Sequence, residues 1–274
     1  MDTTEEKGSG SLSKTYKEYK QLKLKPPFVA TFVAPRESGK THLVTNLLTH
    51  AWKDMFDYII IASPSLEFKD EYKIEHLMKD KKRLLKISKN IGEVVTQIIE
   101  DQKHAAMLHK ENPDEYDVPS TLIILDDIID SGLMRWGSNK NVVDEIAERG
   151  RHYNMSVVIT SQYMSAVSPS LRRNAEALFL FAPINFADVD RTLEEYVPKR
   201  WRKEFLERVE EVFSERFAFI IIDGSVERRL NYRLRLRKGF TDTVLPLEEA
   251  VPDRDEIITP KKNKGKRQSD NSDE

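Results

Sequence analysis

Short runs of apolar residues alternate along this chain with segments in which apolar residues recur at helical spacing. Six of the runs are rich in β-branched or aromatic residues and have the length of β-strands. They lie at 28–33, 57–63, 121–127, 156–162, 177–183 and 217–223. Because these runs are apolar at nearly every position, they predict strands that are covered on both faces, as in a parallel sheet flanked by helices.

The segments between the runs predict helices. Helix-like composition and spacing occur at 41–52, 91–108, 142–149, 187–196 and 199–213. In the last of these, Trp201, Phe205, Val209 and Phe213 recur at intervals of four residues, which predicts ordinary packing against a core. Strands that alternate with helices predict the α/β class, with a mainly parallel central sheet.

The two ends of the chain differ in composition from the part between them. Residues 1–25 are rich in Lys, Glu, Ser and Gly, and residues 251–274 are polar and densely charged. Segments of this kind cannot bury enough apolar surface to offset the entropy that ordering costs. We therefore expect a flexible N-terminal arm at 1–25, one folded domain at 26–250 and a disordered charged tail at 251–274.

Overall composition excludes several classes of protein. The 274 residues include no cysteine, which excludes disulfides, thiolate zinc sites, iron–sulfur clusters and cysteine nucleophiles. The 44 basic and 46 acidic residues nearly cancel, so net charge does not indicate a partner. The apolar runs are far shorter than the roughly 20 residues that a membrane helix needs, and the start MDTTEEKGSG is too polar for a signal peptide. We expect an intracellular, soluble protein without a membrane-spanning segment.

The octapeptide APRESGKT, Ala34–Thr41, lies directly after a predicted strand and directly before a predicted helix. This context is typical of a P-loop, in which backbone N–H groups surround the phosphates of a nucleotide. The predicted phosphate-binding residues are Pro35, Arg36, Glu37, Ser38, Gly39, Lys40 and Thr41. Lys40 would neutralise the β- and γ-phosphate oxygens, and the Thr41 hydroxyl would hold Mg²⁺, so the loop predicts a bound nucleotide with Mg²⁺.

One position departs from the usual P-loop pattern. Ala34 stands where the first glycine is expected. Because alanine is comfortable only at negative φ, we expect the loop entry to avoid a left-handed turn.

The strand TLIILDDI, residues 121–128, ends in two acidic residues and matches a Walker B strand. Asp126 would hold Mg²⁺, usually through water, and Asp127 would polarise the attacking water. The alternative is that the acidic pair simply caps or turns the end of a strand. Gln162, at the end of the next predicted strand, is placed to contact the γ-phosphate or its water; the alternative there is a turn residue.

Two basic segments allow both a structural and a functional interpretation. The cluster KDKKRLLKISK at 79–89 predicts a solvated face, with a nucleic-acid contact as the alternative. The segment RRLNYRLRLRK at 228–238 alternates leucine or tyrosine with Arg233, Arg235 and Arg237, so a strand there would collect three arginines on one face. It is either a charged edge strand or a surface that tracks DNA.

Other catalytic motifs are missing. His42, His50, His76, His104 and His109 show no metal-ligand spacing, and the chain has neither a G-x-S-x-G elbow nor a G-x-G-x-x-G fingerprint. Interpretations as a hydrolase with a G-x-S-x-G elbow or as a dehydrogenase therefore receive little support.

The order of four segments carries a family resemblance. APRESGKT, TLIILDDI, ERGRHYNMSVVITSQ and SPSLRRNAEALFLFAP, within residues 27–225, resemble the FtsK/HerA superfamily, and most of all the genome-packaging ATPases of large double-stranded DNA viruses of the poxvirus type. The resemblance implies a RecA-like P-loop NTPase core of the ASCE group that hydrolyses ATP with Mg²⁺. It also implies a homo-oligomeric ring, a hexamer or pentamer, that moves double-stranded DNA into preformed capsids and meets capsid proteins. The location it implies is the host-cell cytoplasm or a viral factory, with association with the virion as a further option.

The resemblance also ranks the arginines that could complete a neighbour's ATP site. Arg149, Arg151, Arg172 and Arg173 compete for this role, and the Gly-Arg step before the strand that ends in Gln162 places Arg151 first and Arg173 second. The alternative is that Arg151 caps a helix or pairs with Glu148.

Two rival functions remain open at this point. One is a P-loop protein that binds nucleotide as a switch or assembly scaffold without translocation, and the other is an ATPase that acts on protein or RNA. If duplex DNA stimulates ATP turnover, this result would favour a DNA translocase over both of these alternatives.

Overall fold

The computed structural model describes residues 24–52, 54–68, 72, 83–128, 142–183, 186–197, 199, 202–223, 233–237 and 244–246. Nine strands in these residues form one sheet, in the order β3-β2-β4-β5-β1-β6-β7-β8-β9. Their bounds are β1 Val29–Val33, β2 Tyr58–Ala62, β3 Leu84–Ile87, β4 Thr121–Asp126, β5 Met155–Ser161, β6 Ala177–Phe181, β7 Phe219–Asp223, β8 Arg233–Arg237 and β9 Val244–Pro246. The strands from β3 to β6 in this order are parallel, and β7, β8 and β9 each run antiparallel to the preceding strand.

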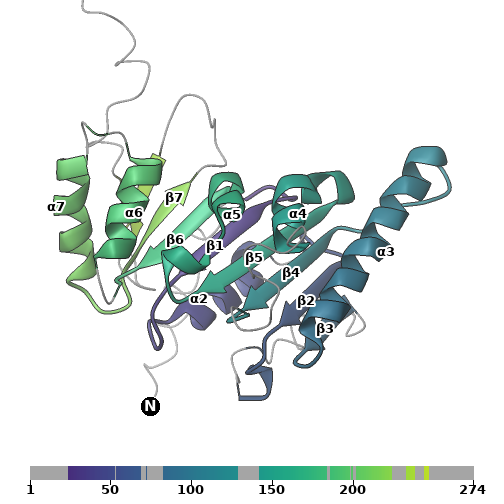
Figure 1. Ribbon diagram of the computed structural model, residues 1–274, viewed down its shortest axis with the longest axis horizontal. Coiled ribbons are helices and arrows are strands. Elements are labelled where there is room, and N and C mark those ends of the chain that lie inside the picture. Colours follow the sequence, from purple (N-terminus) through teal and green to yellow (C-terminus); the bar gives the residue numbers. More distant parts are fainter. Residues whose placement is uncertain are drawn as a thin grey trace, which may run out of the picture.

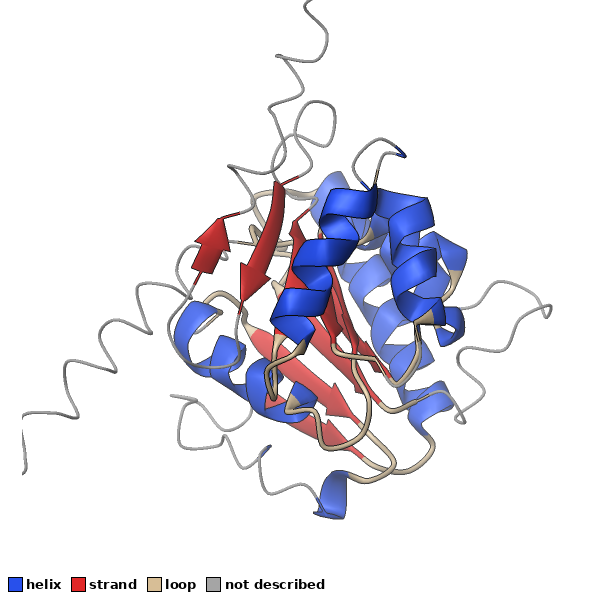
Figure 2. Ribbon diagram, turned by 90° about the vertical axis from the view of Figure 1, so that its left-hand side faces the viewer, coloured by secondary structure: helices blue, strands red, loops and turns tan. Residues whose placement is uncertain are grey.

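Helices cover both faces of the sheet. They are α2 Lys40–Asn46, α3 Ile91–Glu111, α4 Val142–Arg149, α5 Pro169–Asn174, α6 Ala187–Tyr196 and α7 Arg202–Phe213. Helices α3 to α7 pack on one face, and α2 lies on the other (Figures 1 and 2). The predicted α/β architecture, a mainly parallel sheet between helices, is confirmed.

The apolar runs form the core between these layers. All five residues of β1 are buried, and so are all six residues of β4 and all seven of β5. On the α2 face the rings of Phe32 in β1 and Phe179 in β6 stack with centroids 4.2 Å apart. Each of the six predicted runs coincides with a strand to within two residues at either end. Five of these strands run in the same direction, and β7 runs opposite to them, antiparallel to β6.

The structure describes one strand in each of the two basic segments, at 79–89 and at 228–238. Leu84–Ile87, inside the cluster at 79–89, is strand β3 at the edge of the sheet, where Leu84 pairs in register with Ile59. An edge strand tolerates the lysines around it because charge discourages pairing with another chain. Conversely β8 lies between β7 and β9, so the interpretation of 228–238 as an edge strand is wrong.

The predicted helices are present with small shifts of their bounds. After α2 the chain continues as a π-helical turn, η1 (Leu47–Ala51), so the single helix predicted at 41–52 has two parts. The core packing predicted for the last helix is confirmed at Phe205 and Val209, which are buried. Trp201 lies outside the described residues.

The predicted arm and tail lie outside the described residues, apart from Leu24 and Lys25. Leu24 is buried and belongs to the hydrophobic cluster on the α2 face. Among the described helices, none combines the length and the apolar character needed to cross a membrane.

Candidate active site

The loop after β1 has the backbone geometry of a phosphate-binding turn. Glu37 and Gly39 both adopt the left-handed conformation, with φ of 58° and 88°. The Ser38 hydroxyl donates to the carbonyl of Pro35 at 2.8 Å, which closes the loop on itself. Ala34 is buried, does not adopt positive φ, and donates its N–H to the Ser161 carbonyl of β5 at 2.9 Å. The expectation that the loop entry avoids a left-handed turn is therefore confirmed.

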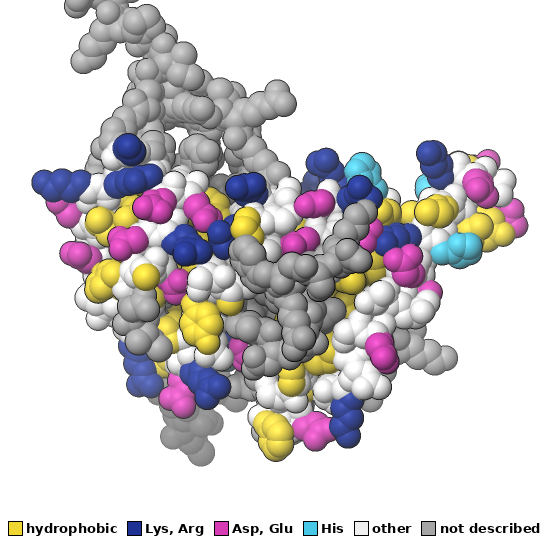
Figure 3. Space-filling model, viewed as in Figure 1, with side chains coloured by type: hydrophobic (Ala, Val, Ile, Leu, Met, Phe, Trp, Pro, Cys, Tyr) yellow, Lys and Arg dark blue, Asp and Glu magenta, His cyan; other side chains and the backbone are white. Residues whose placement is uncertain are grey.

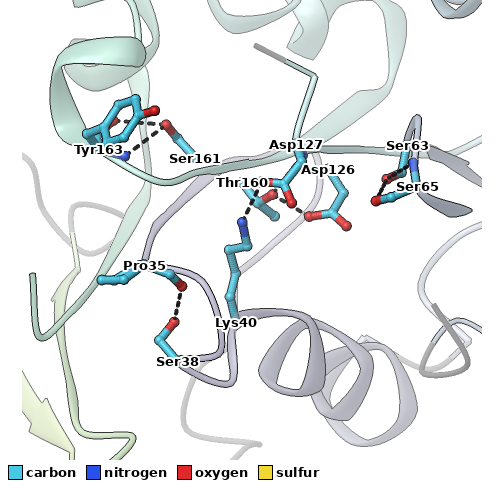
Figure 4. A network of polar contacts seen from close by, with 10 residues as sticks. All are labelled: Pro35, Ser38, Lys40, Ser63, Ser65, Asp126, Asp127, Thr160, Ser161 and Tyr163. Atoms are coloured by element: carbon cyan, nitrogen blue, oxygen red, sulfur yellow. Dashed lines mark hydrogen bonds and ion pairs between the residues drawn. The ribbon is translucent and has the colours of Figure 1, made fainter. Parts of the chain in front are cut away.

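Lys40, the first residue of α2, reaches the end of β4. Its Nζ lies 2.8 Å from Oδ1 of Asp127, and the lysine side chain is 8% exposed and the aspartate 30% exposed (Figure 4). The predicted phosphate-binding lysine and the predicted base are therefore in direct contact across the sheet edge. Phosphate oxygens that approach Lys40 must compete with this carboxylate for the ammonium group.

Asp127 has a strained backbone. Its φ is 54°, in the left-handed region that non-glycine residues seldom adopt, although aspartate tolerates it better than most. Its N–H donates to Thr160 Oγ1 at 3.2 Å, which ties it to β5. Strain of this kind persists only where the surroundings impose it, and it concentrates at functional sites.

Asp126 ends β4 one residue earlier and is completely buried. Thr160 of β5 donates its hydroxyl to Asp126 Oδ1, so one threonine contacts both acids. Thr41 follows Lys40 in the first turn of α2 and is half-buried. A carboxylate and a hydroxyl are hard oxygen donors, and Mg²⁺ in phosphate sites typically takes one or two such protein ligands beside the phosphates, so the residues present fit this ion.

Gln162 follows the last residue of β5 at the same edge and is half-buried. The backbone turns here because the Ser161 hydroxyl donates to the Tyr163 carbonyl at 2.9 Å and accepts from the Tyr163 N–H at 3.3 Å. The carboxyl ends of β1, β4 and β5 thus bring together Lys40, Asp126 and Asp127 with the turn of Ser161 and Tyr163 (Figure 4).

Several polar residues of this edge did not emerge from the sequence motifs. They are Ser63 and Ser65 after β2, with hydroxyls 3.2 Å apart, and Thr160 and Ser161 at the end of β5. The available signal was the same in each case, namely a hydroxyl residue at the end of a buried apolar run.

Arg151 lies at the opposite side of the sheet, where the amino ends of β4 and β5 are. It is exposed in a 3₁₀ turn, η7 (Gly150–Tyr153), which leads into the amino end of β5. The seven residues of β5 separate this turn from Gln162, a distance of about 20 Å at the usual rise per residue. Arg151 is therefore not brought together with the other predicted site residues of its own chain.

Of the two alternative roles of Arg151, the pairing with Glu148 is not seen in the described residues, whereas the position just after the end of α4 is compatible with a cation at a helix C-terminus. Within the part of the chain that the structure describes, its side chain has no hydrogen-bond or ion-pair partner. Glu148 instead accepts from the Ser170 hydroxyl at 2.8 Å. Arg151 and Glu148 both line a small surface hollow between α4, α5 and the start of β1. Lys, Arg and His side chains gather along this edge above α4 and α5 (Figure 3).

The turn that carries Arg151 is held firmly. Gln102 of α3 donates to the carbonyls of Pro119 and Tyr153, at 2.6 and 2.8 Å. Lys103, which bridges Glu100 and Glu145 at 2.7 and 2.8 Å, also lies over the Tyr153 ring. Its two acidic neighbours outweigh the effect of burial and raise the pKa of Lys103.

Arg172 is excluded as a candidate by its burial. Its guanidinium forms a two-pronged ion pair with Glu195, with Nε–Oε2 of 2.7 Å and Nη2–Oε1 of 2.8 Å, and it also donates to the Val167 carbonyl. Arg173, its neighbour in α5, is exposed. Arg149, at the end of α4, is exposed at the same edge as Arg151.

The neighbouring arginines 172 and 173 should differ sharply in their effect on stability. Arg172→Ala removes a buried cation and leaves its acceptors without a donor, so we expect the free energy of unfolding to fall by about 3 kcal/mol. Arg173→Ala should change it by less than about 0.5 kcal/mol. Thermal unfolding of both variants measures the difference; equal melting temperatures would contradict the structural role given to Arg172.

The order of the strands and the residues at their carboxyl ends define a class of protein. A phosphate-binding loop follows β1, an acidic pair ends β4, and β5 lies between these two strands. This is the arrangement of a P-loop NTPase, and solved structures share it. The genome packaging NTPase B204 of Sulfolobus turreted icosahedral virus 2, in complex with AMPPCP, matches 79% of this chain and 100% of its own, with a TM-score of 0.55 and 14% identity. Its sulfate complex matches 80% and 100%, with a TM-score of 0.56 and 15% identity.

The family is more specific than the fold. The poxvirus A32 protein family matches residues 15–235, and the chain belongs to this family. The resemblance to poxvirus-type packaging ATPases that the motifs indicated is thereby confirmed. An uncharacterized protein, 015R, of frog virus 3 (isolate Goorha) is 33% identical over 91 residues, and another, 088R, of invertebrate iridescent virus 3 is 31% identical over 78 residues. These alignments span 32% and 28% of this chain, and only 27% and 29% of the two relatives.

Proposed function

We propose that this protein is an ATP-hydrolysing DNA translocase that packages double-stranded viral DNA into preformed capsids as a homo-oligomeric ring of five or six subunits. The observation that carries the proposal is the division of the site between two edges of one sheet. Lys40 and Asp127 meet at the carboxyl edge, while Arg151, which has no partner among the described residues, is held about 20 Å away at the other. Such a chain completes its site only when the amino edge of one subunit faces the carboxyl edge of the next.

ATP and Mg²⁺ would bind at the carboxyl edge. The loop at 35–39 would surround the phosphates, and Lys40 would exchange Asp127 for the β- and γ-phosphate oxygens. Thr41 and Asp126 would hold Mg²⁺, which neutralises charge on the phosphate oxygens when it is bound. Nucleotide binding by the related NTPase B204, whose structures include an ATP-γS complex, supports this assignment.

Hydrolysis follows from the exchange of partners at Lys40. Once phosphate occupies Lys40, the Asp127 carboxylate is available to accept a proton from water, and Gln162 is placed to orient that water. The water oxygen attacks the γ-phosphorus as the bond to the β,γ-bridging oxygen breaks, which yields ADP and phosphate. Arg151 of the partner subunit would stabilise the charge that develops on the transferred group.

The DNA contact of this motor is assigned to the arginines of β8. Replacing Arg233, Arg235 and Arg237 by Gln should lower the salt dependence of duplex binding by about 0.9 in the logarithmic slope per lost phosphate contact, and leave basal ATP hydrolysis intact. Binding constants measured over a series of salt concentrations give the slope. A matched triple variant of the exposed lysines Lys110, Lys199 and Lys203 is the control. A slope that the arginine variant leaves unchanged would assign β8 to structure alone.

The experiment that tests the proposed function is an ATPase assay with and without duplex DNA at low and moderate salt. A translocase should turn over ATP faster with duplex DNA, and less so as salt weakens the phosphate contacts. Nucleotide binding without turnover would favour the switch or scaffold, and stimulation by RNA or protein alone would favour the third class. Contact with capsid proteins, and a place in the host-cell cytoplasm, the viral factory or the virion, are expectations that follow from a packaging role.

A further inference from the structure

One buried hydroxyl, that of Thr160, links the two acids at the end of β4. Thr160 is completely buried, and its hydroxyl donates to Asp126 Oδ1 and accepts from the N–H of Asp127 at 3.2 Å (Figure 4). A hydroxyl has a single hydrogen to donate, and here that hydrogen is used by Asp126. The proposed metal ligand and the proposed base therefore share one anchor.

The strand that carries this hydroxyl lies between the two halves of the proposed site. In register, Thr160 of β5 is paired with Asp126 of β4 on one side and with Phe32 of β1 on the other. The carbonyl of the next residue, Ser161, accepts from the N–H of Ala34 at the start of the P-loop at 2.9 Å. Consecutive residues of β5 thus hold the acid pair and the loop entry, so the end of β5 sets the spacing between them.

The side chain of Thr160 has little freedom to reorient. Threonine is branched at Cβ, which restricts rotation about χ1, and close packing in the core restricts it further. The bond to Oδ1 therefore fixes the plane of the Asp126 carboxylate, and the bond to the N–H of Asp127 holds a residue whose φ is 54°. Hydrogen bonds of this kind orient metal-binding carboxylates, and losing one typically costs about 10- to 100-fold in metal affinity or activity.

A purely structural role is the alternative. A buried carboxylate needs hydrogen bonds wherever it occurs, and a threonine that serves only this need has to contact Asp126 alone. The second contact, with the backbone of Asp127, does nothing for that carboxylate. It joins the carboxylate to the base, which places the hydroxyl at the junction of metal binding and proton transfer.

We propose that Thr160 is the positioning residue that aligns the Mg²⁺-binding carboxylate of Asp126 with the base, Asp127. The assignment rests on the proposed function, because it concerns the same ATP site. Thr160 is completely buried and acts through the two acids, not on the nucleotide itself. Removal of its hydroxyl should therefore weaken metal binding through Asp126 and slow proton transfer through Asp127, while the loop and Lys40 still hold the phosphates.

The test separates the metal from the nucleotide. Titration calorimetry with AMPPCP, an ATP analogue that is not hydrolysed, measures the affinity at saturating Mg²⁺ and again in EDTA. Thr160→Val keeps the branched shape and loses the hydroxyl. It should lower the affinity in Mg²⁺ about tenfold or more and leave the affinity in EDTA unchanged.

Turnover is the second readout. At saturating Mg²⁺ and ATP, Thr160→Val should retain at most about a tenth of the wild-type kcat, because the base is no longer held in place. Thr160→Ser keeps the hydroxyl and should restore most of both the affinity in Mg²⁺ and kcat. Thr31→Val is the matched control and should alter neither, because it makes the same change in the neighbouring strand β1, where the buried hydroxyl has no hydrogen-bond partner among the described residues.

The outcomes that would overturn the proposal are distinct. Equal affinity in Mg²⁺ and equal turnover in Thr160→Val and wild type would reject it, and an effect on only one of the two would contradict the joint role. An equal loss of affinity in Mg²⁺ and in EDTA, or a loss that Thr160→Ser shares, would assign Thr160 to the structure of the site alone. If wild type bound AMPPCP in neither condition, the ATP site itself would fail, so the two proposals fail in different ways.

Discussion

Asp127→Asn should reduce ATP turnover by about 10²–10⁴-fold while ATP still binds. The substitution removes the proton acceptor but keeps the size of the side chain, and asparagine, like aspartate, tolerates the left-handed backbone found at this position. It also removes the carboxylate that pairs with Lys40, so we expect ATP affinity to equal or exceed that of wild type. Steady-state turnover and equilibrium binding of ATP measure the two effects separately.

Lys40→Ala is the matched contrast. It removes the cation that the β- and γ-phosphates require, so both binding and turnover should be lost. The two side chains contact each other at 2.8 Å, yet we expect their substitutions to have different effects on ATP binding. An equal loss of ATP binding in both variants would refute the separation between a phosphate-binding lysine and a base.

Arg151→Ala should abolish most ATP turnover of the assembled ring, by about 10³-fold, without affecting the fold. The side chain is exposed and unpaired in the described residues, so its removal costs little stability. Because it lies about 20 Å from the carboxyl end of β5, it is too far from the ATP site of its own chain, and we expect it to act on a neighbour. Turnover of purified rings of the variant measures the loss.

Mixed rings distinguish action on a neighbour from a structural role. Arg151→Ala subunits keep an intact P-loop, and Lys40→Ala subunits keep an intact Arg151. Each should be inactive alone and regain part of the turnover when they assemble together, since some interfaces then combine a good loop with a good arginine. The same mixture made with Arg173→Ala tests the second-ranked arginine. If rings shown to be mixed recovered nothing, the assignment of Arg151 to the neighbour's site would be withdrawn.

Much of the fold follows from the sequence because buried parallel strands have a distinctive composition. Each of the six apolar runs matches a strand, since a strand covered on both faces has no reason to alternate with polar residues. Strand β3 escaped prediction for the opposite reason. It is a short edge strand, and the basic cluster around it is tolerated where one side of the strand is unpaired, so the composition of this segment resembles that of a solvated surface.

Strand direction and neighbours are harder to predict than strand existence. The run that forms β7 is as apolar as its parallel counterparts, yet it pairs antiparallel with β6, because hydrophobic pattern reports burial and not direction. The arginine-rich strand β8 has neighbours on both sides, of which β9 is a three-residue strand too short to leave a pattern of its own. Long-range pairing of this kind depends on tertiary structure that no local window contains.

In the candidate site, too, the sequence predicts the individual residues but not all of their contacts. Lys40 and Asp127 were predicted from motifs more than 80 residues apart, and their contact follows from the rule that polar residues after parallel strands gather at one edge. The double contact of Thr160 with both acids depends on where β5 lies in the sheet. The place of Arg151 at the far edge also became visible only once the direction of β5 was known.

Displacement of a third strand from duplex DNA tests the central claim most directly, because it reports movement along DNA and not only hydrolysis. The wild-type ring should release a triplex-forming strand from duplex DNA in the presence of ATP and Mg²⁺. Lys40→Ala and Asp127→Asn rings should not release it. If the wild-type ring hydrolysed ATP in the presence of duplex DNA and left the third strand in place, the protein would not be a translocase.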